Sequence, residues 1–468
     1  MGAPITNVSS WIMTPNRTQP WNPHRSWADP FIAILLLVIL ALAGSHSRLR
    51  PAVLPPAADQ VTLQGRILDA VLGAAKSDAW ARLQRWHRPE LSIAALAAGR
   101  RSGWDQAVLA VHAAEAGDLE TAEKLIQDAP GAPGETFRRS WTWSYRHTGA
   151  PPVPSALPAV RTALGDGCAA RILEARVLAR SGGDPAPLEA QARTWATLHL
   201  LAISGAGLAA LALALSGLGF ALYLALTPAR PRPLPRFGLS GRAVLIVILG
   251  WFLTLMAAAP LAGLLVAALP GLKPVQLPMV YACHALLGTF YLCRAEGLDL
   301  PSLWRRVAPG HHGSALGWGL GFFALAFTSV VAVSLALSPL LPSSESPQKE
   351  LLELLAHLRG PWAVILLFLT VAVLAPAFEE LMFRGFLLPW LGERLEASLG
   401  AQPGRLLAVA VTAVGFAVMH MQPLGLPTLT TLGLVLGFAF LRTGNLVSAI
   451  LVHGLWNGGV FLVMRALG

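Results

Sequence analysis

The sequence is poor in charged residues. Only 13% of its 468 residues are charged, whereas a soluble globular protein carries about 25%. Hydrophobic residues make up 54% of the chain, which excludes a disordered protein, because disorder requires low hydrophobicity and high charge. The same figures exclude an ordinary soluble enzyme. Together with long apolar runs, they predict an all-α polytopic membrane protein.

Cysteine and lysine are also scarce. The cysteines Cys168, Cys283 and Cys293 show no CxxC spacing, so neither a disulfide framework nor a thiolate zinc site is expected. Because lysine is rare, arginine carries nearly all of the positive charge behind the formal net charge of +10. The arginines lie beside apolar runs or are scattered over one polar segment. This distribution favours membrane orientation over nucleic-acid binding.

The N-terminal half of the chain divides into five parts. Residues 1–30 form a polar tail. Residues 31–46 hold a short apolar run that we interpret as a membrane anchor, with a cleaved signal peptide as the alternative. Residues 47–194 are richer in charge and interrupted by Gly/Pro clusters, which predicts a soluble helical domain. A transmembrane helix at 195–226 and an Arg/Pro-rich linker at 227–242 follow.

One stretch of the soluble domain has helical periodicity. Residues 103–129 predict two helices with a turn at Gly117, and they weakly resemble a hairpin of a tetratricopeptide-like array. No 34-residue repeat emerges, so a small irregular helical domain fits equally well. The hypothesis for this domain is that it selects substrates or binds a protein partner. His112 and Glu115 are expected to be structural.

The C-terminal half returns repeatedly to the membrane. Spans are predicted at 195–226, 243–269, 275–294, 314–338, 361–391, 403–421, 424–441 and 445–467, giving eight or nine transmembrane helices with the anchor. Arg-rich connections alternate with Arg-poor ones. The positive-inside rule therefore places the Arg-rich connections in the cytoplasm and the soluble domain outside it. The Ala/Arg/Gly/Pro-rich composition suggests a GC-rich genome and a bacterial plasma membrane.

Two adjacent glutamates interrupt the apolar segment VAVLAPAFEELMFRGFLLPWL. Glu380 and Arg384 are four residues apart and share one face of a helix, so the arginine can hold that carboxylate ionised. Glu379 lies about 100° round the helix and points elsewhere. Two carboxylates in different environments suit a structural role and a proton-transfer role. The alternative is an interfacial Glu–Arg pair at a helix end.

Two further polar groups lie in later apolar segments. His420 ends the motif FAVMH, and His453 and Asn457 belong to the motif HGLWN. The last two are four residues apart and project from one face. An imidazole and an amide there can bind a metal, a water or a developing oxyanion. Taken singly, an interfacial histidine or an interhelical hydrogen bond explains each of them equally well.

The order EExxxR, FxxxH and HxxxN resembles the CPBP family of intramembrane proteases, which includes type 2 CAAX prenyl endopeptidases and bacterial Abi-type or bacteriocin-processing relatives. The resemblance covers about 350–465, with its motifs within 376–457, and the corresponding domain is taken as 243–468. It implies that Glu379 activates a water beside His420 and that the Glu380–Arg384 pair supports the site. It also implies that the histidine and asparagine of HxxxN stabilise the oxyanion or help bind a metal.

The sequence leaves the cofactor and the function class open. Glu379, His420 and His453 can ligate zinc, but HExxH is absent, and a metal-free site is equally consistent. The favoured function is an endopeptidase acting on membrane-associated protein or peptide substrates in the lipid bilayer, with lipidated substrates as one candidate class. A non-catalytic scaffold or immunity-type protein is the first alternative. A transporter is the second, although no internal repeat supports it.

The predicted threading raises a geometric difficulty. Glu379 lies near the far end of the span 361–391, and His420 falls on the opposite side of the membrane. His453 is about 12 Å deep at 1.5 Å per residue. These side chains meet only if helices tilt, break or re-enter. Pro376 can break a helix just before the glutamates, and re-entry is tolerated where the backbone lines a cavity enclosed by protein.

Overall fold

The computed structural model describes seven main segments of the chain: residues 63–75, 103–127, 135–148, 167–227, 232–310, 312–337 and 360–467, with 158, 161 and 164. All regular structure in these segments is helical, which confirms the all-α fold. Eight described helices or helical runs are long and apolar enough to cross a membrane. The tail and the predicted anchor at 31–46 lie outside the described residues.

The chain divides into two compact units. The smaller unit runs from residue 50 to 213 with two short segments from later in the chain, and the larger unit contains residues 214–341 and 345–463. Helix α11 (Ala186–Leu226) contributes residues to both. Each unit is described separately below.

Short helices build the smaller unit: α3 (Leu63–Ala75), α6 (Gly103–Glu115), α7 (Leu119–Gln127), α8 (Glu135–Trp141), π-helix η2 (Thr142–Arg146) and α10 (Cys168–Arg180). The hairpin expected at 103–129 is present as α6 and α7. Gly117 makes the turn with φ +86°, a conformation that glycine adopts without a steric penalty. Asp118 then caps α7 by accepting a 3.0 Å hydrogen bond from the Thr121 backbone N–H.

A charged cluster joins α6, η2, α10 and α11 in this unit. Glu115 accepts hydrogen bonds from Arg176 Nε and Nη2 at 2.7 and 2.8 Å and from the Tyr145 hydroxyl at 2.9 Å. Arg176 Nη1 also donates to Glu189 at 2.7 Å. Burial raises the pKa of Tyr145 well above its usual value, and the Glu115 carboxylate adds to the effect. The tyrosine therefore remains a neutral donor to Glu115.

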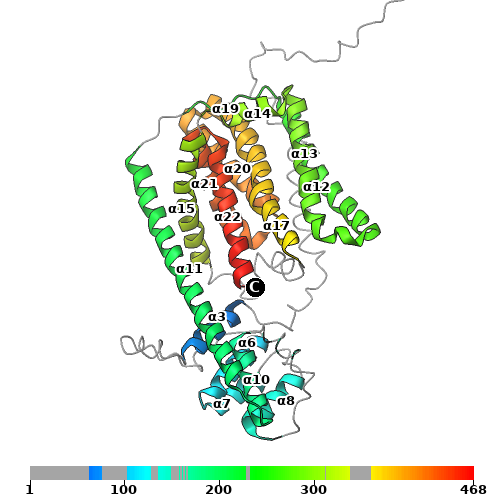
Figure 1. Ribbon diagram of the computed structural model, residues 1–468. Helices are drawn as coiled ribbons and strands as arrows, with labels where there is room; N and C mark the ends of the chain where they lie inside the picture. Colours follow the sequence, from blue (N-terminus) through cyan, green and yellow to red (C-terminus); the bar gives the residue numbers. More distant parts are fainter. Residues whose placement is uncertain are drawn as a thin grey trace, which may run out of the picture. The chain divides into compact units, whose positions relative to one another are not determined.

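The larger unit is a bundle of long apolar helices (Figure 1). It comprises the end of α11 and the following elements: α12 (Gly241–Ala268), η4 (Pro270–Val275), α13 (Gln276–Glu296), α14 (Leu300–Val307), α15 (His312–Leu337), the helical run 361–399, α20 (Ala401–Met419), η8 (Pro423–Gly425), α21 (Leu426–Thr443) and α22 (Leu446–Leu467). Among these, α20 packs against α21, and α21 packs against α15.

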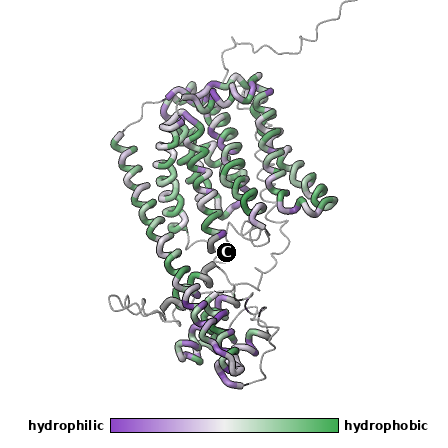
Figure 2. Tube along the Cα trace, viewed as in Figure 1, coloured by the Kyte–Doolittle hydropathy of each residue, from purple (hydrophilic) through white to green (hydrophobic). Residues whose placement is uncertain are grey.

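The surface of the long helices is apolar. Leucines of α11 such as Leu211, Leu215 and Leu218 are more than half exposed. Figure 2 shows that hydrophobic residues dominate the helices of the larger unit, while polar residues gather at the end that carries α14 and α19. Exposed apolar faces of this length match the hydrocarbon core of a bilayer.

The Arg-rich connections of the larger unit meet at one end of the bundle. Arg232 donates to the Thr443 carbonyl, and Arg405 donates to the carbonyl of Arg232 at 2.8 Å. Arg306 donates to the Arg236 carbonyl at 3.2 Å. These bonds link connections far apart in sequence, in agreement with the alternation of Arg-rich and Arg-poor connections. Their assignment to the cytoplasm stays a prediction.

The helix does not break at Pro376, although a break there is one of the alternatives that the sequence offers for bringing the site residues together. Residues 361–399 form one helical run of five elements: α17 (Pro361–Leu369), π-helix η6 (Thr370–Leu374), α18 (Ala375–Glu380), π-helix η7 (Leu381–Leu387) and α19 (Leu388–Leu399). Pro376 lies in the first turn of α18, directly after the π-turn, and proline is tolerated at such a position. The run therefore continues past 391, the predicted end of the span, to Leu399.

Candidate active site

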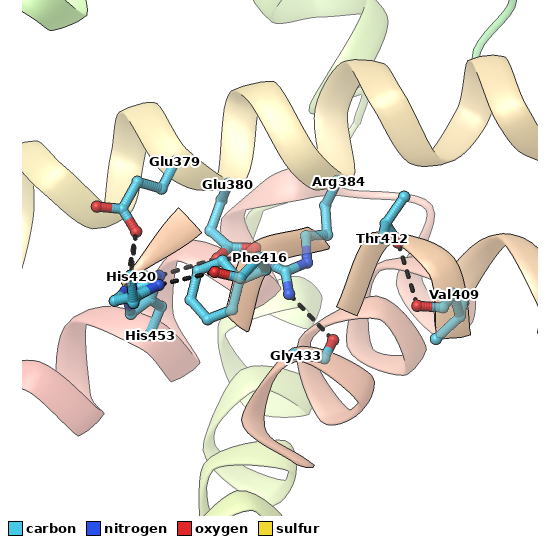
Figure 3. A network of polar contacts seen from close by, with 9 residues as sticks. All are labelled: Glu379, Glu380, Arg384, Val409, Thr412, Phe416, His420, Gly433 and His453. Atoms are coloured by element: carbon cyan, nitrogen blue, oxygen red, sulfur yellow. Dashed lines mark hydrogen bonds and ion pairs between the residues drawn. The ribbon is translucent and has the colours of Figure 1, made fainter. Parts of the chain in front are cut away.

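Four elements supply the polar residues predicted from the sequence. Glu379 and Glu380 end α18, and Arg384 follows one turn later in η7. His420 is the C-cap of α20. His453 lies on α22. Figure 3 shows these five side chains converging between three segments of the bundle.

A tight turn explains why Glu379 and His420 meet. Gly400 has φ +87° and lies between α19 and α20, which pack against each other. Residues equally far from such a turn lie opposite each other in an antiparallel pair, and Glu380 and His420 are equally far from Gly400. The threading that kept them on opposite sides of the membrane is therefore wrong. It ended the glutamate span too early, so it placed Glu379 at a span end instead of halfway along a 39-residue run.

Glu380 and Arg384 form a fully buried ion pair. Both side chains are 0% exposed, and Arg384 Nη1 donates to Glu380 Oε1 at 2.8 Å. Arg384 Nη2 donates to the Gly433 carbonyl of α21 at 3.0 Å, and the guanidinium lies 4.6 Å from the centre of the Phe416 ring. Buried charges need such compensation, because an unpaired one is very costly. The pair therefore ties the glutamate helix to α20 and α21.

The same carboxylate orients His453. The imidazole Nδ1 lies 2.9 Å from Glu380 Oε1. Because a carboxylate only accepts, Nδ1 carries the proton and Nε2 of the neutral ring is left with a lone pair. That Nε2 lies 3.9 Å from Glu379 Oε2. Glu380 thus fixes the tautomer of a histidine that faces the neighbouring glutamate.

His420 presents its ring to Glu379 in the same way. Its Nδ1 donates to the Phe416 carbonyl at 2.8 Å, so its Nε2 also carries a lone pair in the neutral ring. That Nε2 lies 4.0 Å from Glu379 Oε2. The Glu379 and His420 side chains are 18% and 29% exposed, in contrast to the fully buried Glu380. Three acceptor groups thus face one space without bonding directly to one another.

This spacing suits a water molecule. Two hydrogen bonds of about 2.8 Å that meet at about 90° span about 4 Å. A water between Glu379 and either imidazole therefore has an acceptor for each of its protons. No two of the three groups can bond each other directly while both histidines are neutral.

The residues also fit part of the pattern of a metal site. Histidines that bind metals donate their other ring N–H to a carboxylate or a backbone carbonyl, and both His420 and His453 do so. Their convergence is looser than that of a closed site. In the described residues, the group of three potential ligands within 4.8 Å of one another lies elsewhere, at Asp69, His112 and Cys168.

Asn457 makes a different contact from the other five residues. Its Nδ2 donates to the Val371 carbonyl in π-helix η6 at 3.1 Å. The structure therefore places this amide against the helix that carries the glutamates.

Sequence reasoning missed the role of Phe416. Its ring lies 4.6 Å from the His420 ring and 5.4 Å from the His453 ring, both nearly edge-on, and its carbonyl fixes the His420 tautomer. The fixed spacing FxxxH contained this signal, because a residue four before a histidine on a helix offers it a carbonyl. No sequence pattern predicts the contact between Arg384 and Gly433, because Gly433 accepts the hydrogen bond with its backbone carbonyl, which every residue type has.

A comparison with known protein families identifies the same segment of the chain that holds the three motifs. Residues 361–459 match the family described as Type II CAAX prenyl endopeptidase Rce1-like. The match spans all three motifs and confirms the resemblance to the CPBP family of intramembrane proteases. No curated protein and no solved structure matches the chain.

Proposed function

From the Rce1-like match and the site geometry, we propose that this protein is an intramembrane endopeptidase that hydrolyses peptide bonds with a water activated by Glu379. The observation that carries the proposal is the convergence of Glu379 Oε2 with His420 Nε2 and His453 Nε2 at 4.0 and 3.9 Å. The family match supports an intramembrane CAAX-type protease at the level of the family.

The proposed reaction divides the work among the three groups. Glu379 takes a proton from the water as its oxygen attacks the peptide carbonyl, and then gives that proton to the leaving nitrogen. The tetrahedral oxyanion needs an N–H donor. His453 can supply it only as an imidazolium that is protonated before the reaction, with Nδ1 donating to Glu380 and Nε2 to the oxyanion. The attacking water then has Glu379 and neutral His420 as its acceptors. His420 has a neutral carbonyl behind it and suits water binding.

A divalent ion is the alternative means of activating the water. Glu379, His420 and His453 would hold it, and it would make the bound water more acidic or polarise the peptide carbonyl. We favour the metal-free form, because the acceptors are spaced for hydrogen bonds to water. Metal analysis of purified wild-type protein and His453→Gln tests this choice. Stoichiometric metal that disappears in His453→Gln contradicts it.

The substrate we propose is a membrane-associated protein or peptide, with a lipidated or apolar C-terminus as the favoured class. The site lies halfway along a helix that is apolar enough to span the bilayer, so the scissile bond must reach membrane depth. A C-terminal segment with apolar or lipidated side chains enters that environment at a lower cost than a segment with charged side chains.

The decisive test compares new protein termini in membranes of cells that express matched variants. Glu379→Gln keeps the shape of the side chain but removes the base. Glu393→Gln is the control, because Glu393 lies on the same helical run at an exposed position. Termini present in wild type and Glu393→Gln but absent in Glu379→Gln establish proteolysis and identify the substrate. Identical termini in all three, with a wild-type phenotype of folded Glu379→Gln, favour the scaffold alternative.

A further inference from the structure

A second polar cluster lies buried in the smaller unit. Asp69 on α3, His112 on α6 and Cys168 at the first position of α10 are each 2% exposed. One potential ligand atom of each lies within 4.8 Å of those of the others. These residues are 43 to 99 positions apart in sequence, and no motif connects them.

The surrounding backbone is shaped around this cluster. A Cβ on Gly73 would lie 2.4 Å from Cys168 Sγ, and a Cβ on Gly167 would lie 2.0 Å from Asp69 Oδ2. Both distances are far below van der Waals contact, so only glycine lets the helices approach so closely. Asp69 Oδ2 accepts from the Cys168 N–H at 2.7 Å, and Oδ1 accepts from the Ala169 N–H at 2.8 Å. The carboxylate is thereby held at the start of α10.

Hydrogen bonds among the described residues leave the cluster incomplete. His112 Nε2 lies 2.7 Å from Asp69 Oδ1, but the buried Nδ1 has no hydrogen-bond partner in the part of the chain that the structure describes. A buried polar atom without a partner costs about 1–3 kcal/mol. This Nδ1 lies across the ring from the Nε2 that meets Asp69, so the hydrogen bonds of the described residues satisfy only one of the two ring nitrogens of His112.

We propose that Asp69, His112 and Cys168 bind a single zinc-class divalent ion. Thiolate, imidazole and carboxylate are the ligands that Zn²⁺ takes in proteins. The charges also balance, because a thiolate and a carboxylate neutralise Zn²⁺ beside a neutral histidine. Binding releases the thiol proton of Cys168 to solvent. The start of α10 favours the thiolate form, since backbone N–H groups at a helix N-terminus stabilise negative charge.

The ion would join three helices of the smaller unit. Its ligands come from α3, α6 and α10, so the metal would add cross-links to the hydrogen bonds and apolar contacts that already hold these short helices together. Three protein ligands leave one coordination position for water. This site is independent of the proposed peptidase chemistry, because none of its ligands belongs to the larger unit.

The test measures metal in full-length protein purified in detergent without a metal-binding tag. We expect about one zinc per chain in wild type and in Cys283→Ser, whose cysteine lies in the larger unit. Cys168→Ser and Asp69→Asn should lose the metal. His453→Gln should keep it, which separates this site from the candidate active site. Wild type without metal, metal retained in Cys168→Ser, or metal lost only in His453→Gln overturns the proposal.

Cobalt provides a second readout if Cys168→Ser folds poorly. Co²⁺ bound to a thiolate gives a charge-transfer absorption band, so adding Co²⁺ to chelator-treated wild type should produce it. Adding Zn²⁺ should abolish the band and raise the unfolding temperature of the protein. No thiolate band and no thermal shift in folded wild-type protein contradicts the assignment independently of any variant.

Discussion

The contact between Asn457 and Val371 yields a prediction that separates a positioning role from a catalytic one. In π-helix η6 the Ala375 N–H donates five residues back, to the Thr370 carbonyl. The next carbonyl in that register, Val371, faces Pro376, which has no N–H. The Asn457 amide supplies the missing donor from α22. Replacing it with alanine removes a hydrogen bond inside a membrane span, where water does not replace it.

The expected loss of unfolding free energy follows from the hydrogen bond that is removed and the carbonyl that is left without a donor. Interhelical hydrogen bonds in membranes contribute about 0.6 kcal/mol on average and about 1.7 at most, while an unsatisfied buried carbonyl costs about 1–3 kcal/mol. We therefore expect Asn457→Ala to lower the free energy of unfolding by about 1–2 kcal/mol. Pro376→Ala restores a backbone N–H to the helix. In the Pro376→Ala background, Asn457→Ala should leave the free energy of unfolding almost unchanged. The coupling energy between Asn457 and Pro376 is therefore expected to be about 1 kcal/mol.

The assay is a double-mutant cycle in detergent micelles, with helix loss followed by circular dichroism during denaturation. Pro389→Ala provides the control background, because Pro389 lies in α19 of the same helical run. In the Pro389→Ala background, Asn457→Ala should lower the free energy of unfolding as much as it does in the wild-type background. Equal costs in the wild-type and Pro376→Ala backgrounds would refute the positioning role. Loss of cleavage by a fully stable Asn457→Ala, not rescued by Pro376→Ala, would instead support the oxyanion role implied by the family resemblance.

Three further predictions concern other parts of the structure. Arg384→Ala should lower the unfolding free energy by about 3–5 kcal/mol, because it removes the guanidinium paired with the buried Glu380 and, among the described residues, leaves that carboxylate with the His453 N–H alone; the double variant Glu380→Gln/Arg384→Met should lower it less in the same denaturation assay. Gly454→Ala should cost about 1–3 kcal/mol and reduce cleavage, because its methyl would lie 2.6 Å from a backbone carbonyl of the facing helix, whereas Gly459→Ala, in open space, should change neither. Tyr145→Phe should flatten the loss of stability at alkaline pH: the raised pKa of Tyr145 means that its stabilisation is complete below pH about 10 and disappears as pH rises through the folded-state pKa. An unchanged alkaline profile for Tyr145→Phe would refute that last prediction.

Much of the bundle could be predicted because a bilayer imposes simple rules. A span needs about 20 apolar residues, so apolar runs locate the helices. The i, i+4 geometry of a helix was enough to pair Glu380 with Arg384, as observed. The meeting of Glu379 with His420 was also encoded, in equal spacings on either side of Gly400. The family resemblance implied this meeting, but the predicted threading did not, because it ended the span at 391 and placed Glu379 near a span end.

The parts of the two sites that could not be predicted depend on contacts that no local sequence pattern reveals. The Gly433 carbonyl receives Arg384 through its backbone, so its residue type predicts nothing about the contact. The cluster of Asp69, His112 and Cys168 forms only when three separate helices pack. Cysteine spacing argued against a zinc site because it detects ligands that are close in sequence. Such spacing says nothing of ligands gathered from distant helices.

The motif HxxxN gains a physical meaning from these contacts. His453 reaches Glu380, Gly454 lets the backbone approach the carbonyl of Ala372, and Asn457 reaches the carbonyl of Val371. In α-helical register the Ala372 carbonyl would also pair with the missing N–H of Pro376. The helix α22 thus packs against two carbonyls of the turn that precedes Pro376. A slip of α22 by one residue would rotate it by about 100° and break all three contacts together. The contacts of α22 with this turn therefore set the register in which His453 faces the glutamates.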